Sequence, residues 1–233
     1  MEKLVYLTRN PAASPAEYRR QMLDEIAPRV LEAGAVALTA AFNDLQEEIP
    51  KPMLLLGEGA SLGAAISLWI PSLDDRGPIE AAIAEGCARF EGFLVTESIP
   101  QPCEGRDWAD GERSPGVTHF TWFAKAPGVT DEDFYRNWHE VHTPFSFELH
   151  PLRCEYVRDA VVRSVTPGAE SIRAIVGERF NEIRDYTDPR RLFGSKEVLK
   201  RSAEEAGDYG DPDRMHSAPL SEYILRTAPW ARR

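Results

Sequence analysis

Residues 131–144, read DEDFYRNWHEVHTP, have the pattern of an amphipathic helix with two histidines at the edge of its buried face. Side chains three or four residues apart share one face of a helix, and the apolar residues here follow that spacing. The apolar stripe consists of Phe134, Trp138, Val141 and Phe145. Tyr135, His139 and His142 form a second stripe one residue further round. Ionisable rings beside an apolar face are the first candidates for chemistry.

Composition and charge narrow the class of protein. The chain has 233 residues, 42% of them hydrophobic and 28% charged, which allows one large globular domain or two smaller ones. The net charge of −11 argues against nucleic acid or an anionic membrane as partner. The three cysteines form no C-x-x-C pair, and no apolar run approaches the ~20 residues of a membrane helix. The N-terminus has no signal-peptide pattern. We therefore expect a cytoplasmic enzyme or binding protein.

The chain reads as two repeats of one pattern of strands and helices. The first repeat contains strands at 3–9, 35–43, 64–70 and 93–99, with helices at 14–32 and from Pro78 onward. The second contains strands at 117–125, 152–163, 172–180 and 220–226, with helices at 131–146 and 189–206. The order β-α-β-β-α-β is that of a ferredoxin-like unit. We therefore expect an α+β protein with a first, structural repeat at 1–100, a linker at 101–115 and a second repeat at 116–233.

The two repeats differ where chemistry is expected. Aligning their leading helices sets Leu23 and Ile26 of the first repeat against His139 and His142 of the second. Aliphatic residues at these places indicate inward-facing positions. The second repeat thus carries imidazoles where the first carries apolar side chains, which locates the predicted pocket between the second sheet and the helix at 131–146.

A longer run, FAKAPGVTDEDFYRNWHEVHTP at residues 123–144, resembles the EthD family. That family belongs to the dimeric α+β barrel superfamily, in which two ferredoxin-like units join their sheets into a barrel. The resemblance implies a tandem fusion that forms a pseudo-dimeric barrel within one chain. It also implies an aromatic or polyketide-like substrate, because the superfamily includes cofactor-free cyclases, decarboxylases, dehydratases and monooxygenases. Haem proteins are members too, so the fold does not name the reaction.

Four residues are candidates for catalysis. His142 is the expected general base, because an imidazole can take and return a proton near neutral pH. His139 lies on the same side and either shares the substrate or orients His142. On the strand LRCEYVRD, Tyr156 and Arg158 alternate onto the apolar side, where they could stabilise an enolate oxygen. Structural roles remain open for all four: a hydrogen-bonded His142, a solvent-exposed His139 at the helix edge, a packed Tyr156 and a strand-end ion pair for Arg158.

Further residues are expected to bind substrate, and a metal is not expected. The predicted substrate-binding residues are Trp138, Tyr135, Phe134, His119 and His216. His216 lies within residues 206–218, a Gly-, Pro- and Asp-rich stretch that predicts a loop, either a lid over the pocket or a surface loop. The HEVH sequence has one residue too few between its histidines for the H-E-x-x-H zinc motif.

The sequence thus predicts a cofactor-independent lyase or isomerase that uses histidine acid–base chemistry on a carbonyl compound, by dehydration, decarboxylation or cyclisation. Two alternatives stay open. One is a haem protein with a histidine as axial ligand. The other is a non-catalytic small-molecule binding protein. The fused barrel could also associate as a homodimer.

Overall fold

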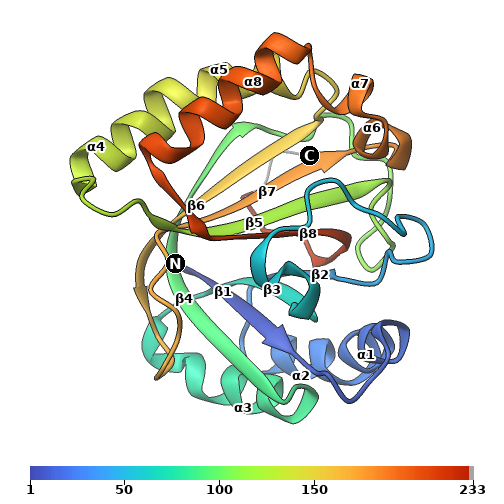
Figure 1. Cartoon of the computed structure of the whole chain (residues 1–233). Coiled ribbons are helices and arrows are strands. Elements are labelled where there is room, and N and C mark those ends of the chain that lie inside the picture. Colours follow the sequence, from blue (N-terminus) through green and yellow to red (C-terminus); the bar gives the residue numbers. More distant parts are fainter. Residues whose placement is uncertain (231–233) are drawn as a thin grey trace.

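Eight antiparallel strands close into one barrel in the computed structural model, which describes residues 1–230 (Figure 1). The strands are β1 (Glu2–Arg9), β2 (Ala37–Phe42), β3 (Ala64–Ile70), β4 (Arg89–Gln101), β5 (Val117–Lys125), β6 (Glu155–Ser164), β7 (Ala174–Phe180) and β8 (Gly210–Arg226). Their order around the barrel is β1-β3-β2-β8-β5-β7-β6-β4. The predicted α+β class and the barrel are therefore confirmed.

Each half of the chain supplies four neighbouring strands. The first half runs β4-β1-β3-β2, and the second half runs β8-β5-β7-β6 in the corresponding order. Two antiparallel seams join the halves, one between β2 and β8 and one between β4 and β6. Every strand thus has a hydrogen-bonded neighbour on both sides, so the barrel has no exposed edge.

The inside of the barrel is filled by alternate side chains of its strands. On β1, Val5 and Leu7 belong to a core that draws residues from all eight strands, and only the barrel interior can gather such a set. Leu4 and Tyr6 point the other way, into the core beneath the first-half helices. The large interior side chains include Phe93, Phe120 and Trp122. The interior is a packed core.

Helices cover two opposite sides of the barrel (Figure 1). The first half supplies α1 (Pro15–Gln21), α2 (Ala27–Glu32) and α3 (Gly77–Gly86), and the second supplies α4 (Asp131–Arg136), α5 (Thr143–Leu149) and α8 (Lys196–Glu205). Two short helices, α6 (Ile183–Thr187) and α7 (Pro189–Leu192), and three 3-10 turns, η2 (Gly57–Ser61), η3 (Leu73–Arg76) and η5 (Ala206–Asp208), complete the described elements. Within residues 1–230, no helix combines the length and the apolar character that crossing a membrane requires.

A π-helical turn interrupts the leading helix of each half. These turns are η1 (Met22–Ile26) and η4 (Asn137–His142). The helices predicted at 14–32 and 131–146 are therefore composite, and the second continues to Leu149. A π turn holds an extra residue and rotates the residues that follow it. This rotation explains why Val141, predicted in the buried stripe, is 46% exposed, whereas Phe134, Trp138 and Phe145 are buried.

Two other predicted boundaries are wrong in the second half. The helix predicted at 189–206 breaks between α7 and α8, because the chain at Gly194 passes so close to α5 that a Cβ there would lie 2.3 Å from the Glu148 carbonyl oxygen. The loop predicted at 206–218 is mostly strand, since β8 starts at Gly210. Pairing with β5 holds this Gly- and Pro-containing segment extended.

The predicted linker lies across one end of the barrel. Ser114 Oγ donates a hydrogen bond to Glu222 Oε1 over 3.0 Å. Two guanidinium groups lie near the Trp108 ring, that of Arg106 at 5.4 Å and that of Arg179 at 4.8 Å from the ring centroid. Burial and the nearby Glu155 raise the pKa of Glu222 to about 7. The linker therefore covers a polar barrel end.

The buried ion cluster of Lys3 gives a test of the barrel interior. Lys3 is 5% exposed and its Nζ contacts Glu97 and Asp159, with 2.8 Å to Asp159 Oδ1. We expect Lys3→Ala to lower the free energy of unfolding by about 3–5 kcal/mol, because two carboxylates lose their partner. Urea denaturation measures this loss. The exposed Lys51→Ala serves as control and should change stability by less than about 0.5 kcal/mol. A loss below about 1 kcal/mol in Lys3→Ala would contradict the cluster.

Candidate functional site

His142 lies beside a carboxylate that sequence reasoning missed. It ends the π turn η4 and is half-buried, with Nδ1 3.5 Å from Glu205 Oε2. Glu205 is the last residue of α8, and both its carboxylate oxygens are buried without a hydrogen bond among the described residues. The Tyr209 ring packs against the imidazole, at 5.1 Å between centroids. An imidazole beside a carboxylate is the arrangement of a general base with an orienting group.

His139 lies one turn earlier and is held neutral. Its ring packs on Trp138 at 4.7 Å and on Tyr135 at 5.5 Å. Burial, together with the charge of Arg158, lowers the pKa of His139 from 6.5 to about 4. Its Nε2 is buried and has no hydrogen bond among the described residues. His139 is therefore a neutral imidazole at physiological pH, with one nitrogen available to a ligand.

Arg158 is anchored to the helix that carries both histidines. From β6, its Nη1 donates to Thr143 Oγ1 over 2.6 Å, and its Nε donates to Ser98 Oγ over 3.2 Å. The Thr143 hydroxyl in turn donates to the Trp138 carbonyl over 2.9 Å. Burial lowers the pKa of Arg158, but a guanidinium stays charged in proteins. Arg158 thus places a fixed positive charge near His139 and Thr143.

Two buried tyrosines stay protonated in this region. Burial, followed by the charge of Glu178, raises the pKa of Tyr156 to about 12. Tyr156 is 1% exposed and lies under the guanidinium of Arg153, 4.2 Å from its ring. Burial raises the pKa of Tyr209 well above its usual value, with further contributions from Tyr156 and Glu205. Both phenols can therefore donate a hydrogen bond at neutral pH.

The space predicted as a pocket beneath this helix is packed with aromatic side chains. Phe134, Trp138 and Tyr209 join Phe123 and Tyr156 in one buried cluster, and Tyr135 packs at its margin. Phe123 lies 5.8 Å from Tyr209 and 5.9 Å from Trp138 between ring centroids. The sequence did not predict that Tyr209, in the turn before β8, would occupy this space. A substrate must displace it to reach the cluster.

His119 belongs to a different network. On β5 it pairs in register with Glu178, and its Nδ1 lies 3.2 Å from the Tyr186 hydroxyl. Glu178 contacts the buried Arg153. Burial alone would raise the pKa of Glu178, but the neighbouring positive groups, Arg153 among them, lower it to about 2. Burial lowers the pKa of His119 to about 4. His119 is thus part of a buried polar network beneath α6, and its contacts are not those of the His142 site.

His216 lies on β8, so its prediction as a loop residue is wrong. Its Nδ1 accepts a hydrogen bond from the Glu58 backbone N–H over 3.0 Å, and its Nε2 lies 3.4 Å from Glu170. Its ring is 5.3 Å from Trp122, inside the barrel. His150, just after α5, is buried with Nδ1 2.9 Å from the Leu192 carbonyl oxygen. Neither histidine is brought to His142 in the described contacts.

Aromatic side chains occupy the space beside the site histidines that a haem would need. The Tyr209 ring packs against the His142 imidazole, whose Nδ1 lies 3.5 Å from Glu205 Oε2. A carboxylate at Nδ1 leaves Nε2 free, as in many metal-binding histidines, so haem binding stays a prediction from the sequence. No group of three or more His, Cys, Asp or Glu side chains within residues 1–230 is arranged to hold a metal ion.

Weak sequence signals existed for the residues that were missed. Thr143 follows His142 in the His-Thr-Pro ending of the motif. The motif indicated that this segment matters, but it did not predict the hydrogen bond between Arg158 and the Thr143 hydroxyl. Glu205 and Tyr209 lie near the start of the stretch predicted as a loop. An aromatic residue among glycines and aspartates was the available signal there. Their positions depend on the packing of α8 along α5, which no local pattern encodes (Figure 1).

Comparisons with known proteins define the fold class. No family model matches the chain, and no curated protein matches its sequence. The structure is similar to an anthrone oxidase-like protein (TM-score 0.62, 12% identity, 100% of this chain and 96% of that one). It is also similar to two proteins described as candidate monooxygenases. The one from Fusobacterium nucleatum subsp. nucleatum has a TM-score of 0.55 and 10% identity, over 100% of this chain and 97% of that one. The one from Lactobacillus acidophilus NCFM has a TM-score of 0.50 and 9% identity, over 97% of this chain and 96% of that one.

These neighbours have the dimeric α+β barrel fold, and the chain shares it along its whole length. At identities of 9–12% the likeness concerns the fold alone. Membership of the EthD family stays a prediction from the sequence motif.

Acid titration tests the buried His119 network. The folded-state pKa of about 4 lies below the unfolded value of 6.5, so stability is complete above pH 6.5 and falls as pH drops toward 4. His119→Gln should remove this component, about 2–3 kcal/mol between pH 7 and 4.5, because glutamine does not titrate. Urea denaturation at both pH values measures it. Glu178 keeps Arg153 as partner in the variant. An equal pH-dependent loss in variant and wild type would contradict the neutral, buried histidine.

Proposed function

We propose that the chain is a tandem pair of ferredoxin-like repeats whose second repeat carries a cofactor-independent acid–base site. The reaction proposed is removal of a proton from a carbon next to a carbonyl group in an aromatic or polyketide-like compound. The pairing of His142 with Glu205 is the observation that carries this proposal. Elimination of water or ring closure then follows from the enolate. In a decarboxylation, loss of CO₂ would itself form the enolate, and the protonated histidine would supply the proton that quenches it. Either course makes the protein a lyase or an isomerase.

His142 is the base in this mechanism. Because its Nδ1 faces the Glu205 carboxylate, the tautomer with hydrogen on Nδ1 is favoured and Nε2 keeps its lone pair. Nε2 takes the substrate proton, and the buried carboxylate stabilises the imidazolium that forms. The same nitrogen returns the proton later in the cycle.

Two groups suit the negative charge that develops on the carbonyl oxygen. Tyr156 keeps its proton because burial raises its pKa. Arg158, fixed by Thr143, adds a positive charge. Hydrogen bonds and charges already in place favour an enolate more than a neutral carbonyl, which lowers the barrier to proton removal.

Substrate access requires movement of the segment that carries Glu205 and Tyr209. Helix α8 packs along α5 over this site (Figure 1). An aromatic substrate can take the place of the Tyr209 ring and stack against Trp138 and Phe134. In this proposal α8 and η5 act as a lid, a role that the sequence suggested for residues 206–218.

Solvent exchange tests the proton-removal step. In D₂O, the wild-type protein should accelerate deuterium incorporation beside the carbonyl of 2-tetralone, followed by NMR. His142→Ala should lower this acceleration by about 10²–10⁴-fold because it removes the base. Glu205→Gln should lower it less, because the imidazole remains but loses its carboxylate partner.

Two exposed neighbours provide matched controls. Val141→Ala and Glu204→Gln alter residues beside the proposed pair, and both should exchange at the wild-type rate. Wild-type exchange by His142→Ala would refute the assignment of the base. Saturable binding of 2-tetralone without exchange would favour the non-catalytic binding alternative.

A further inference from the structure

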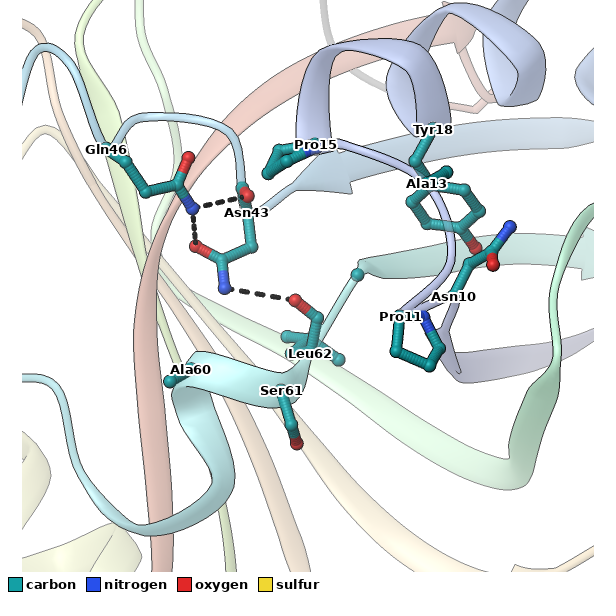
Figure 2. A pocket seen from close by; sticks show the side chains of 11 residues that line it. Asn10, Pro11, Ala13, Pro15, Tyr18, Asn43, Gln46, Ala60, Ser61 and Leu62 are labelled. Atoms are coloured by element: carbon teal, nitrogen blue, oxygen red, sulfur yellow. Dashed lines mark hydrogen bonds between the residues drawn. The ribbon is translucent and has the colours of Figure 1, made fainter.

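A cavity of about 150 Å³ lies in the first half, and its lining contains no histidine (Figure 2). Three segments form it: the turn from β1 into α1, the residues after β2, and the residues before β3. Its lining consists of Asn10, Pro11, Ala13, Pro15, Tyr18, Asn43, Gln46, Ala60, Ser61, Leu62 and Gly63. Tyr18 and Leu62 are buried, whereas Pro15, Gln46 and Ala60 are exposed at the rim. The cavity therefore has a closed base and an open mouth.

Hydrogen bonds hold the walls of this cavity in place. Asn43 Nδ2 donates to the carbonyls of Gly59 and Leu62 over 3.2 and 3.0 Å. Gln46 Nε2 donates to the backbone carbonyl and the side-chain oxygen of Asn43, and Figure 2 shows this chain of amides along one wall. The backbone N–H of Gly63 donates to the backbone carbonyl oxygen of Thr8 over 2.8 Å. The cavity is preformed, which reduces the entropy a ligand would lose by ordering it.

A glycine is needed where the cavity meets the ring of Tyr18. A Cβ at Gly63 would lie 2.7 Å from the Tyr18 ring, so only glycine allows this approach. The Tyr18 hydroxyl donates to Thr8 Oγ1 over 2.6 Å, which fixes the ring. Pro11 and Pro15 add two more rings to the lining (Figure 2). The cavity thus offers flat apolar surfaces together with amides.

The polar groups that remain available are neutral. Within the described residues, Asn10 Oδ1 and Gln46 Oε1 have no hydrogen-bond partner in the protein, and the lining contains no carboxylate, guanidinium or ammonium group. Arg9 comes within 3.4 Å of Ser61 Oγ, but its charge is paired with Glu58 and Glu91. The lining therefore offers no unpaired positive group to an anionic ligand, and the net charge of −11 disfavours anion binding further.

From this geometry we infer that the first half binds a small neutral compound with one planar ring and a hydrogen-bond donor such as a carboxamide. The ring packs against Tyr18 and the prolines, and the donor reaches the free oxygens of Asn10 and Gln46. A cavity of about 150 Å³ accommodates a single six-membered ring. The first repeat, predicted from the sequence as purely structural, therefore has a binding site of its own.

Benzamide and benzoate form a matched probe pair for this site. They have nearly the same shape, but benzoate is an anion and lacks the amide donor. Titration of the full chain, followed by protein NMR, should show saturable shifts at Asn43 and Gly63 with benzamide, and binding at least tenfold weaker with benzoate. Because no lining group titrates near neutrality, the Kd for benzamide should be constant from pH 6 to 8.

Variants locate the binding and separate it from the proposed acid–base site. Gln46→Ala should weaken benzamide binding about five- to tenfold, and Ala60→Phe should abolish it by filling the mouth. Ala12→Phe adds the same bulk at an exposed position outside the lining and should bind as wild type. His142→Ala should also bind as wild type. Equal binding of benzoate, or unchanged benzamide binding by Ala60→Phe, would overturn the inference.

Discussion

Closure of the sheet is the constraint on which the rest of the structure depends. The seams between β2 and β8 and between β4 and β6 pair the two edge strands of each half with those of the other half. Closure gives the backbone of every strand hydrogen-bond partners on both sides. Side chains from all eight strands fill the interior. A packed interior has no room for a substrate. Chemistry is therefore confined to the outer faces, beneath the helices, and to the barrel ends.

The two outer faces diverge although their strands follow the same order. Both leading helices contain a π turn at corresponding positions, η1 and η4. In the first half this turn contributes Ile26 to an aliphatic core, whereas in the second it ends at His142 beside Glu205. The difference comes from α8 and the turn after it, which place Glu205 and Tyr209 over the second face. The first half keeps an open, uncharged cavity at the opposite end of its leading helix.

Much of the fold followed from local pattern, while the detail of the site did not. Short runs rich in apolar and β-forming residues located the strands, and the helical spacing of Phe134 and Trp138 located the second leading helix. The π turn escaped prediction because its extra residue leaves no mark on composition, and Val141 was misplaced in consequence. Residues 210–218 read as a loop because their glycine and proline disfavour strands locally, yet β5 supplies the pairing that holds them extended. Glu205 was missed because its partner lies about sixty residues away in sequence and only tertiary packing joins them.

The second outer face is proposed to carry out chemistry once its aromatic side chains are displaced, and a crystal structure of the full chain with a bound aromatic ketone is the test. We expect ligand density between η4 and α8, with the Tyr209 ring moved aside. The carbon beside the carbonyl should lie about 3–3.5 Å from His142 Nε2. Density confined to the barrel interior or to the first-half cavity, with Tyr209 still against His142, would contradict it.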